Sequence, residues 1–217
     1  MGRRLAQHAG HKENRLAIEQ ALTPPLSAPE AFTHVRIIIG IVLGLCISRV
    51  LIGSASLVQH PHRKKTCFTH MAWVAFALLS VVHFWWLEFN LRSIQVWGFE
   101  IYLFIIFYAA LHFLLCAMLF PEHMQEYASY HDYFISRRRW FFGLLILIQV
   151  ADVYDTILKG WDHFNSYGIE YPLSVVVIIG FSIVAMVTRK AWFHAWFAGL
   201  ALFYAIAFSL RHFTTLS

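Results

Sequence analysis

The stretch FTHMAWVAFALLSVVHFWWLEF, residues 68–89, decides the fold class of this chain. It contains no lysine, arginine or aspartate, and its single glutamate, Glu88, is the penultimate residue. A helix needs about 20 predominantly apolar residues to cross the hydrocarbon core of a bilayer, because each residue adds about 1.5 Å. The stretch is therefore predicted to be a transmembrane helix.

Further apolar blocks of similar length surround this one along the chain. They cover residues 36–58, 96–120, 140–158, 173–188 and 191–210. None of them contains proline, and tryptophans gather near their ends, as expected of an aromatic belt at the membrane surface. We therefore expect an all-α, polytopic integral membrane helix bundle with about six transmembrane helices, embedded in the lipid bilayer.

The overall composition agrees with this fold class. Of the 217 residues, 59% are hydrophobic and 13% are charged, whereas soluble domains carry about 25% charged residues. The net charge is +5, but the basic residues lie between apolar blocks and form no recognised nucleic-acid module, so no nucleic-acid partner is expected. Residues 1–31 are predicted to be a polar N-terminal tail and residues 32–217 a six-helix transmembrane domain.

Six helices place both ends of the chain on one side of the membrane. Loops one, three and five then share the other side, and their basic residues are Arg63, Lys64, Lys65, Arg137, Arg138, Arg139, Arg189 and Lys190. Loops two and four hold only Arg92 and Lys159. The positive-inside rule therefore predicts that loops one, three and five are cytoplasmic, although the basic N-terminal tail argues for the opposite orientation.

The first and fourth apolar blocks begin alike. Arg36 and Gly40 match Arg139 and Gly143 at an offset of 103 residues, and Arg49 matches Asp152 at the same offset. If the match reflects a repeat, each half holds three helices and the second half is inverted relative to the first. Inverted repeats are typical of transporters.

Ionisable side chains inside the apolar blocks are the candidate functional residues, because each costs about 2.5–3.5 kcal/mol at a helix centre. By their depth along the helices, the candidates gather in the half of the membrane nearer the chain ends: His83, Glu88, Glu100, Asp152 and Asp155. Glu100, Tyr108 and His112 follow one another in steps of four or eight and are expected to share a face turned to the bundle interior. Arg49 is deeper, and we expect it to pair with one of the acids.

The favoured hypothesis is a transporter-like or channel-like protein for protons or another small cation. Asp152, Asp155 and Glu100 would be the cation or proton sites. His83 would relay protons, because its ordinary pKa of about 6.5 lets small shifts change its charge. Arg49 would serve as a structural or gating counter-ion.

Two other interpretations remain open. One is a non-catalytic membrane subunit or scaffold, which could form a homo-oligomer through small-residue faces such as Gly40, Gly44 and Ser48. The other is a membrane enzyme that binds a metal or haem, with candidate ligands His83, Glu88, Glu100, Asp152 and His163. The sequence does not identify a cofactor.

Overall fold

The computed structural model describes residues 27–59, 67–121 and 126–212. Six helices in these ranges are long and apolar enough to cross a membrane, which confirms the expected fold class. They are α2 (Ala28–Gln59), α3 (Phe68–Leu87), α4 (Phe99–Ala117), α5 (Tyr130–Leu158), α7 (Glu170–Val187) and α8 (Ala191–His212). The 3-10 helix η1 (Glu88–Ser93) follows α3, and the short helix α6 (Trp161–Ser166) lies between α5 and α7. The chain is a multi-pass membrane protein.

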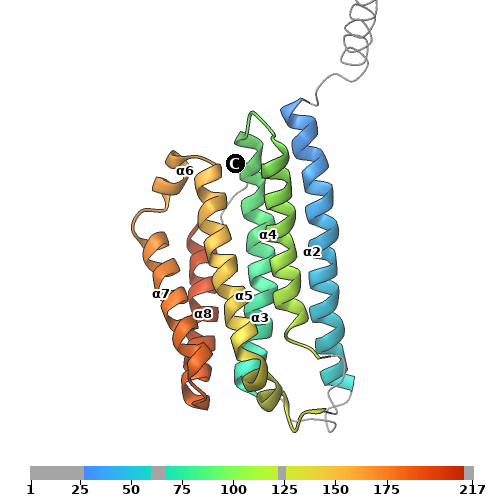
Figure 1. Ribbon diagram of the computed structural model, residues 1–217, viewed down its shortest axis with the longest axis vertical. Coiled ribbons are helices and arrows are strands. Elements are labelled where there is room, and N and C mark those ends of the chain that lie inside the picture. Colours follow the sequence, from blue (N-terminus) through green and yellow to red (C-terminus); the bar gives the residue numbers. More distant parts are fainter. Residues whose placement is uncertain (1–26, 60–66, 122–125, 213–217) are drawn as a thin grey trace, which may run out of the picture.

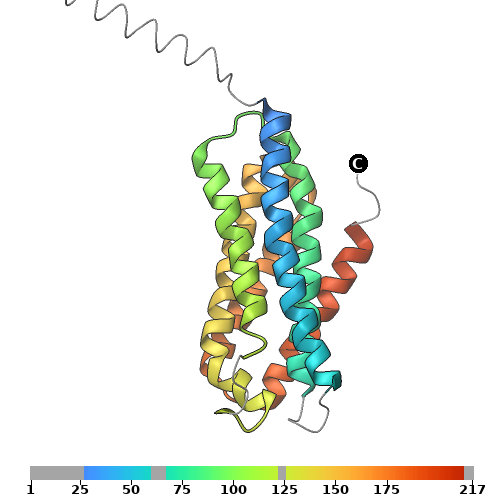
Figure 2. The same cartoon turned by 90° about the vertical axis from the view of Figure 1, so that its right-hand side faces the viewer.

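Successive long helices run in opposite directions, so the bundle has two distinct ends (Figure 1). The upper end holds the start of α2 together with η1 and α6, and the lower end holds the starts of α3, α5 and α8. The central helix is α3, which packs against α2, α4, α5 and α8. The upper part of α8 leans away from the bundle axis (Figure 2).

The helix packing does not repeat between the two halves. In the first half α2 packs mainly on the third helix of that half, α4, whereas in the second half α5 packs mainly on the second helix, α7. Within the described residues the backbones of α5 and α8, which would correspond to α2 and α4, do not approach one another closely, although Phe142 and Phe197 stack between them. The 103-residue match in the sequence is therefore not accompanied by a matching arrangement of helices.

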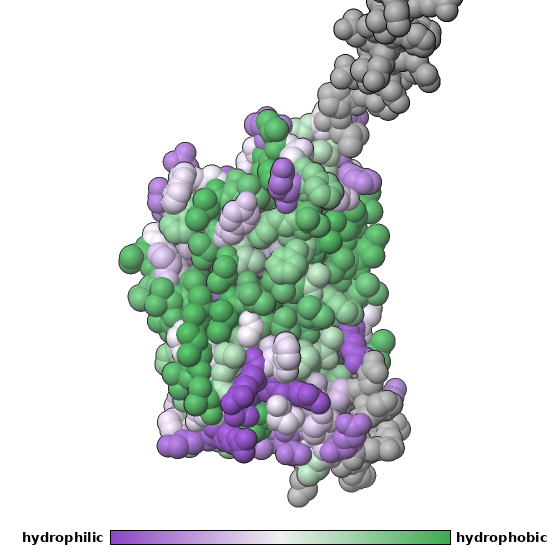
Figure 3. Space-filling model, viewed as in Figure 1, coloured by the Kyte–Doolittle hydropathy of each residue, from purple (hydrophilic) through white to green (hydrophobic). Residues whose placement is uncertain are grey.

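On the face shown in Figure 3, an apolar surface covers the middle of the bundle, and polar residues lie toward its ends. On α2, for example, Ile41 and Ile52 are 62% and 68% exposed. Lipid tails can cover such side chains at no cost, because the tails are as apolar as the side chains themselves. The surface therefore fits a bilayer rather than water.

Two helices are longer than the membrane requires. With 32 and 29 residues, α2 and α5 reach about 48 and 44 Å, beyond the roughly 30 Å of hydrocarbon. The first turn of α2 begins at Ala28, inside the segment expected to be the polar tail. At this end of the helix, Glu30 accepts hydrogen bonds from the amide and the hydroxyl of Ser27, at 2.9 and 2.7 Å. Similarly, Arg137–Arg139 lie within α5 rather than in a loop.

Aromatic side chains fill the lower half of the core. Trp73 is fully buried, and its ring centroid lies 5.0 Å from that of Phe141, 5.5 Å from that of Phe142 and 5.2 Å from that of Phe197. We call these four residues the aromatic plug. Because they come from α3, α5 and α8, the plug holds three helices together without any polar contact.

Small residues on α2 have two different surroundings. A Cβ atom at Gly53 would lie 2.3 Å from the Phe120 ring, whereas a Cβ atom at Gly44 would meet nothing within 4 Å. The absence of a side chain at Gly53 therefore lets Phe120, in the segment after α4, pack directly against α2. Gly44 is exposed on the outer surface, and the homo-oligomer through this face stays a prediction.

We expect Gly53→Ala to lower the melting temperature of the detergent-purified protein, since overpacking costs about 1–3 kcal/mol. Gly44→Ala is the matched control on the same helix. It should be neutral or stabilising by up to about 1 kcal/mol, because alanine favours helix. Thermal unfolding followed by circular dichroism compares the two, and equal melting temperatures would contradict the Phe120 contact.

Candidate functional site

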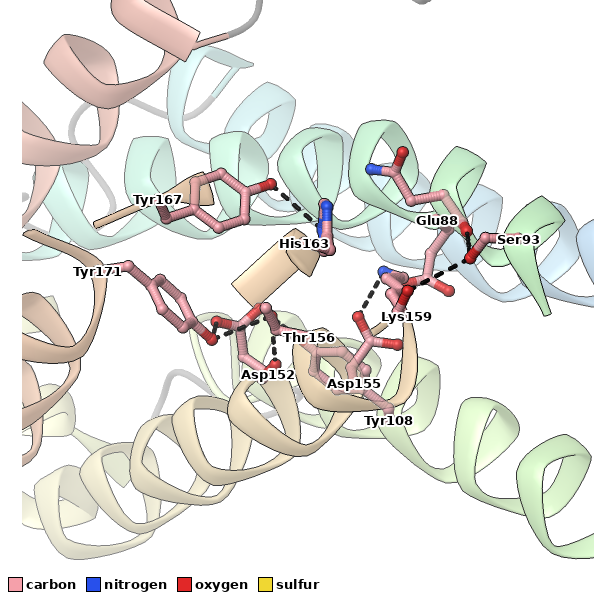
Figure 4. A network of polar contacts seen from close by, with 11 residues as sticks. Glu88, Ser93, Tyr108, Asp152, Asp155, Thr156, Lys159, His163, Tyr167 and Tyr171 are labelled. Atoms are coloured by element: carbon pink, nitrogen blue, oxygen red, sulfur yellow. Dashed lines mark hydrogen bonds and ion pairs between the residues drawn. The ribbon is translucent and has the colours of Figure 1, made fainter. Parts of the chain in front are cut away.

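A cavity of about 120 Å³ lies in the upper half of the bundle, between α3, α4, α5, α7 and α8. His83, Asp152, Asp155 and His163 all line it, so the structure brings together four of the residues singled out from the sequence. Figure 4 shows the polar side chains at this end of the bundle. The cavity is the candidate functional site.

The first part of the site is a buried group of charges. The Lys159 ammonium, one residue beyond α5, donates to Glu88 Oε1 at 3.0 Å and also pairs with Asp155. The three side chains are only 1–3% exposed. Glu88 belongs to η1, so this contact joins the upper ends of α3 and α5.

The ammonium does not satisfy both carboxylates completely. Glu88 Oε2 and Asp155 Oδ1 are buried and have no hydrogen-bond partner within the described residues. Buried carboxylate oxygens normally accept hydrogen bonds, because an unpaired polar group costs about 1–3 kcal/mol. Asp155 lines the cavity, but its Oδ1 atom itself has almost no accessible surface.

The second part of the site surrounds Asp152, one turn before Asp155 on α5. Its carboxylate accepts hydrogen bonds from the hydroxyls of Tyr108 on α4, at 3.0 Å, and Tyr171 on α7, at 2.7 Å. Thr156 supports this arrangement, since its hydroxyl lies 3.1 Å from the Tyr171 hydroxyl and donates to the Asp152 carbonyl. No lysine, arginine or histidine among the described residues forms an ion pair with Asp152.

Three histidines also reach the cavity. His83 is hydrogen-bonded to Ser209 of α8, and His112 stacks on Phe84 with a centroid separation of 4.7 Å. His163 of α6 lies 3.5 Å from the Tyr167 hydroxyl. Burial lowers the pKa of His163 from its ordinary 6.5, and the positive charge of Lys159 lowers it further, so this ring is neutral at pH 7.

Two predicted site residues lie elsewhere. Glu100 is exposed in the first turn of α4 and does not line the cavity, which corrects the expectation that it shares an inward face with Tyr108 and His112. Eight residues of helix rotate by about 800°, so Glu100 points about 80° away from Tyr108. Its position suits the helix dipole, which favours acids in the first turn.

Arg49 lies toward the lower end of α2 and donates to the Phe120 carbonyl at 2.8 Å. No ion pair joins it to an acid in the described part of the chain, so the expected acid–arginine pair is also corrected. The physical reason is depth, because the described acids of the site are at the opposite end of the bundle. Arg49 instead satisfies a carbonyl that follows the end of α4.

The suggested metal ligands do not form a metal centre. In the described ranges no group of three or more histidine, cysteine, aspartate or glutamate side chains is arranged to hold a metal ion. Of the five candidates, Glu100 is outside the cavity and Glu88 is engaged with Lys159.

Two residues of the site, Lys159 and Tyr171, were not among those predicted from the sequence. Lys159 was counted only as a loop charge, although its spacing of four from Asp155 is typical of an ion pair on one helix face. Nothing in the sequence identifies Tyr171 as a partner of Asp152, because the two residues belong to different helices.

We predict that Lys159→Met strongly destabilises the protein, since it leaves two buried carboxylates without a counter-charge. Breaking a buried ion pair in this way costs about 3–5 kcal/mol. Adding Glu88→Gln and Asp155→Asn to the same chain should recover much of the loss. The control is Lys190→Met, at an exposed position. Melting temperatures in detergent compare the stability of the single, triple and control variants. A Lys159→Met variant as stable as Lys190→Met would contradict the structural role of the Lys159 ion pairs.

No model of a known protein family matches this chain, and neither curated proteins nor solved structures show a significant match to it, so its function is inferred from its own residues and their geometry.

Proposed function

We propose that this membrane protein binds protons or another small cation at Asp152 and carries them across the bilayer. The observation that supports this most is the state of Asp152, which lines the cavity, accepts two tyrosine hydroxyls and has no basic partner among the described residues. A carboxylate held in this way is ready to accept a positive charge from the cavity.

Charge balance around the cavity supports the same function. Glu88, Asp152 and Asp155 supply three carboxylates against the single ammonium of Lys159, a formal charge of −2 when all four are ionised. Uncompensated charge in a membrane interior is costly. Protons or cations taken up from solution offset it, and cavities with surplus carboxylates select cations.

The aromatic plug favours a carrier over an open pore. Phe76 lines the cavity, and Trp73 lies one turn nearer the lower end of α3. On α5 and α8, Phe142 and Phe197 are likewise nearer the lower end than the cavity residues Gln149 and Ala205. The plug therefore separates the cavity from the lower end, and a cation would pass only after these helices rearrange.

Asp152→Asn, which keeps the size and most hydrogen bonds of the side chain, should reduce cation-driven current at least about tenfold, because losing a charged partner costs about 1.5–3 kcal/mol. The matched control is Asp162→Asn, an exposed acid of α6 at the same end of the bundle. Proteoliposomes on a solid-supported membrane give the current after jumps of pH, sodium, potassium or small ammonium ions. Wild-type currents equal to those of empty liposomes would contradict transport, and an unaffected Asp152→Asn variant would contradict the role of Asp152 in it.

We further propose that the lower end is cytoplasmic. Arg137–Arg139, Arg189 and Lys190 all lie there, as the positive-inside rule requires of cytoplasmic segments. The cavity would then lie in the non-cytoplasmic half of the membrane.

Cysteine labelling tests this orientation. In a chain without its own cysteines, an impermeant maleimide should label Gln95→Cys on intact cells and Lys190→Cys only after permeabilisation. Both positions are exposed, Gln95 after η1 at the upper end and Lys190 at the lower end. The reverse labelling pattern would invert the orientation.

A further inference from the structure

The wall of the cavity is largely aromatic. Rings from four helices and from the residue after α6 line it: Phe84, Tyr108, Tyr167, Tyr171, Tyr204 and Phe208. Such rings carry a negative face that attracts cations, most effectively where water is excluded. The cavity therefore offers more than carboxylate charge to a cation.

The rings contact one another around the cavity. Phe84 and Tyr108 meet with centroids 4.7 Å apart, and Tyr167 links Tyr171, at 5.6 Å, to Phe208, at 6.1 Å. Tyr108 and Tyr171 are also the two residues whose hydroxyls hold Asp152. The carboxylate thus lies beside the rings, so one occupant could contact both.

The volume of the cavity suits a small occupant. At about 120 Å³ it is slightly smaller than a protein cavity of roughly 150 Å³ that binds benzene. A cation of about three to six heavy atoms fits such a space.

The chemistry of the wall favours an organic cation over an inorganic one. A bare metal ion needs a shell of oxygen ligands to replace its water, about six to eight for calcium. The described residues provide no group of three metal-binding side chains, and the two hydroxyls nearest Asp152 already donate to it. An alkylammonium ion is bound instead by aromatic faces and one carboxylate.

The Asp152 carboxylate adds a requirement for N–H donors. It lines the cavity, and its two oxygens each accept one tyrosine hydroxyl, which leaves further lone pairs for an occupant. Asp155 adds a second carboxylate beside the cavity, one turn away on the same face of α5. A primary ammonium group can donate to Asp152, whereas a quaternary ammonium group has no hydrogen to donate.

We propose that the cavity binds a small alkylammonium ion, with Asp152 as counter-charge and hydrogen-bond acceptor and the aromatic wall around the alkyl group. This inference rests on the proposed cation site and names the substrate class of that site.

Isothermal titration of the detergent-purified full-length protein with ethylammonium tests the proposal. We expect saturable binding that weakens at least tenfold in Asp152→Asn and not in Asp162→Asn. Phe208→Leu, which removes a ring but keeps an apolar side chain, should weaken binding about threefold or more. Phe203→Leu is its matched control on the outer face of α8, where Phe203 is 70% exposed.

The outcomes separate this inference from the proposed function. Asp152-dependent proton, sodium or potassium currents without ethylammonium binding would overturn the alkylammonium proposal and leave cation transport intact. Binding of tetramethylammonium as tight as that of ethylammonium would overturn the hydrogen bond to Asp152 and with it the proposal as stated. Absence of both binding and current would overturn the inference and the proposed function together.

Discussion

The buried ammonium of Lys159 is the contact on which the upper half of the bundle depends. It joins η1 to the end of α5 through Glu88 and Asp155, at a depth where these carboxylates could not remain ionised alone. Because one ammonium faces two carboxylates, the contact holds the helices together and still leaves unpaired acceptors. The proposed cation site at Asp152 therefore lies beside the residues that hold these helices together.

The two halves of the bundle use different physical means to hold their helices. The lower half packs Trp73 against phenylalanine rings, and the buried Trp73 Nε1 atom has no hydrogen-bond partner among the described residues. The upper half replaces this packing with hydrogen-bonded tyrosines and carboxylates around a cavity. In a membrane, where water cannot satisfy stray polar groups, such a change is costly unless the polar groups serve a purpose. This contrast is the reason to propose the cation site in the upper half.

Asp152 illustrates which features of the site can be predicted from the sequence. Its position inside an apolar block predicts that it is a functional candidate, and its depth predicts that it lies near His83. Both residues do line the cavity. The same reasoning was wrong for Glu100, because residues eight apart do not lie on the same helix face. It was also wrong for the acid partner of Arg49, because no described acid of the site lies at the depth of Arg49.

The sequence by itself determined that the chain crosses the membrane and approximately where, since the length and hydropathy of a spanning helix are properties of one continuous segment. It also determined that acids gather in one half, because depth follows from counting residues along each helix. Only the tertiary structure decided that Lys159 is buried between two acids and that Tyr108 and Tyr171 hold Asp152. Those contacts join residues from different helices, and they depend on how each helix is rotated and packed against its neighbours.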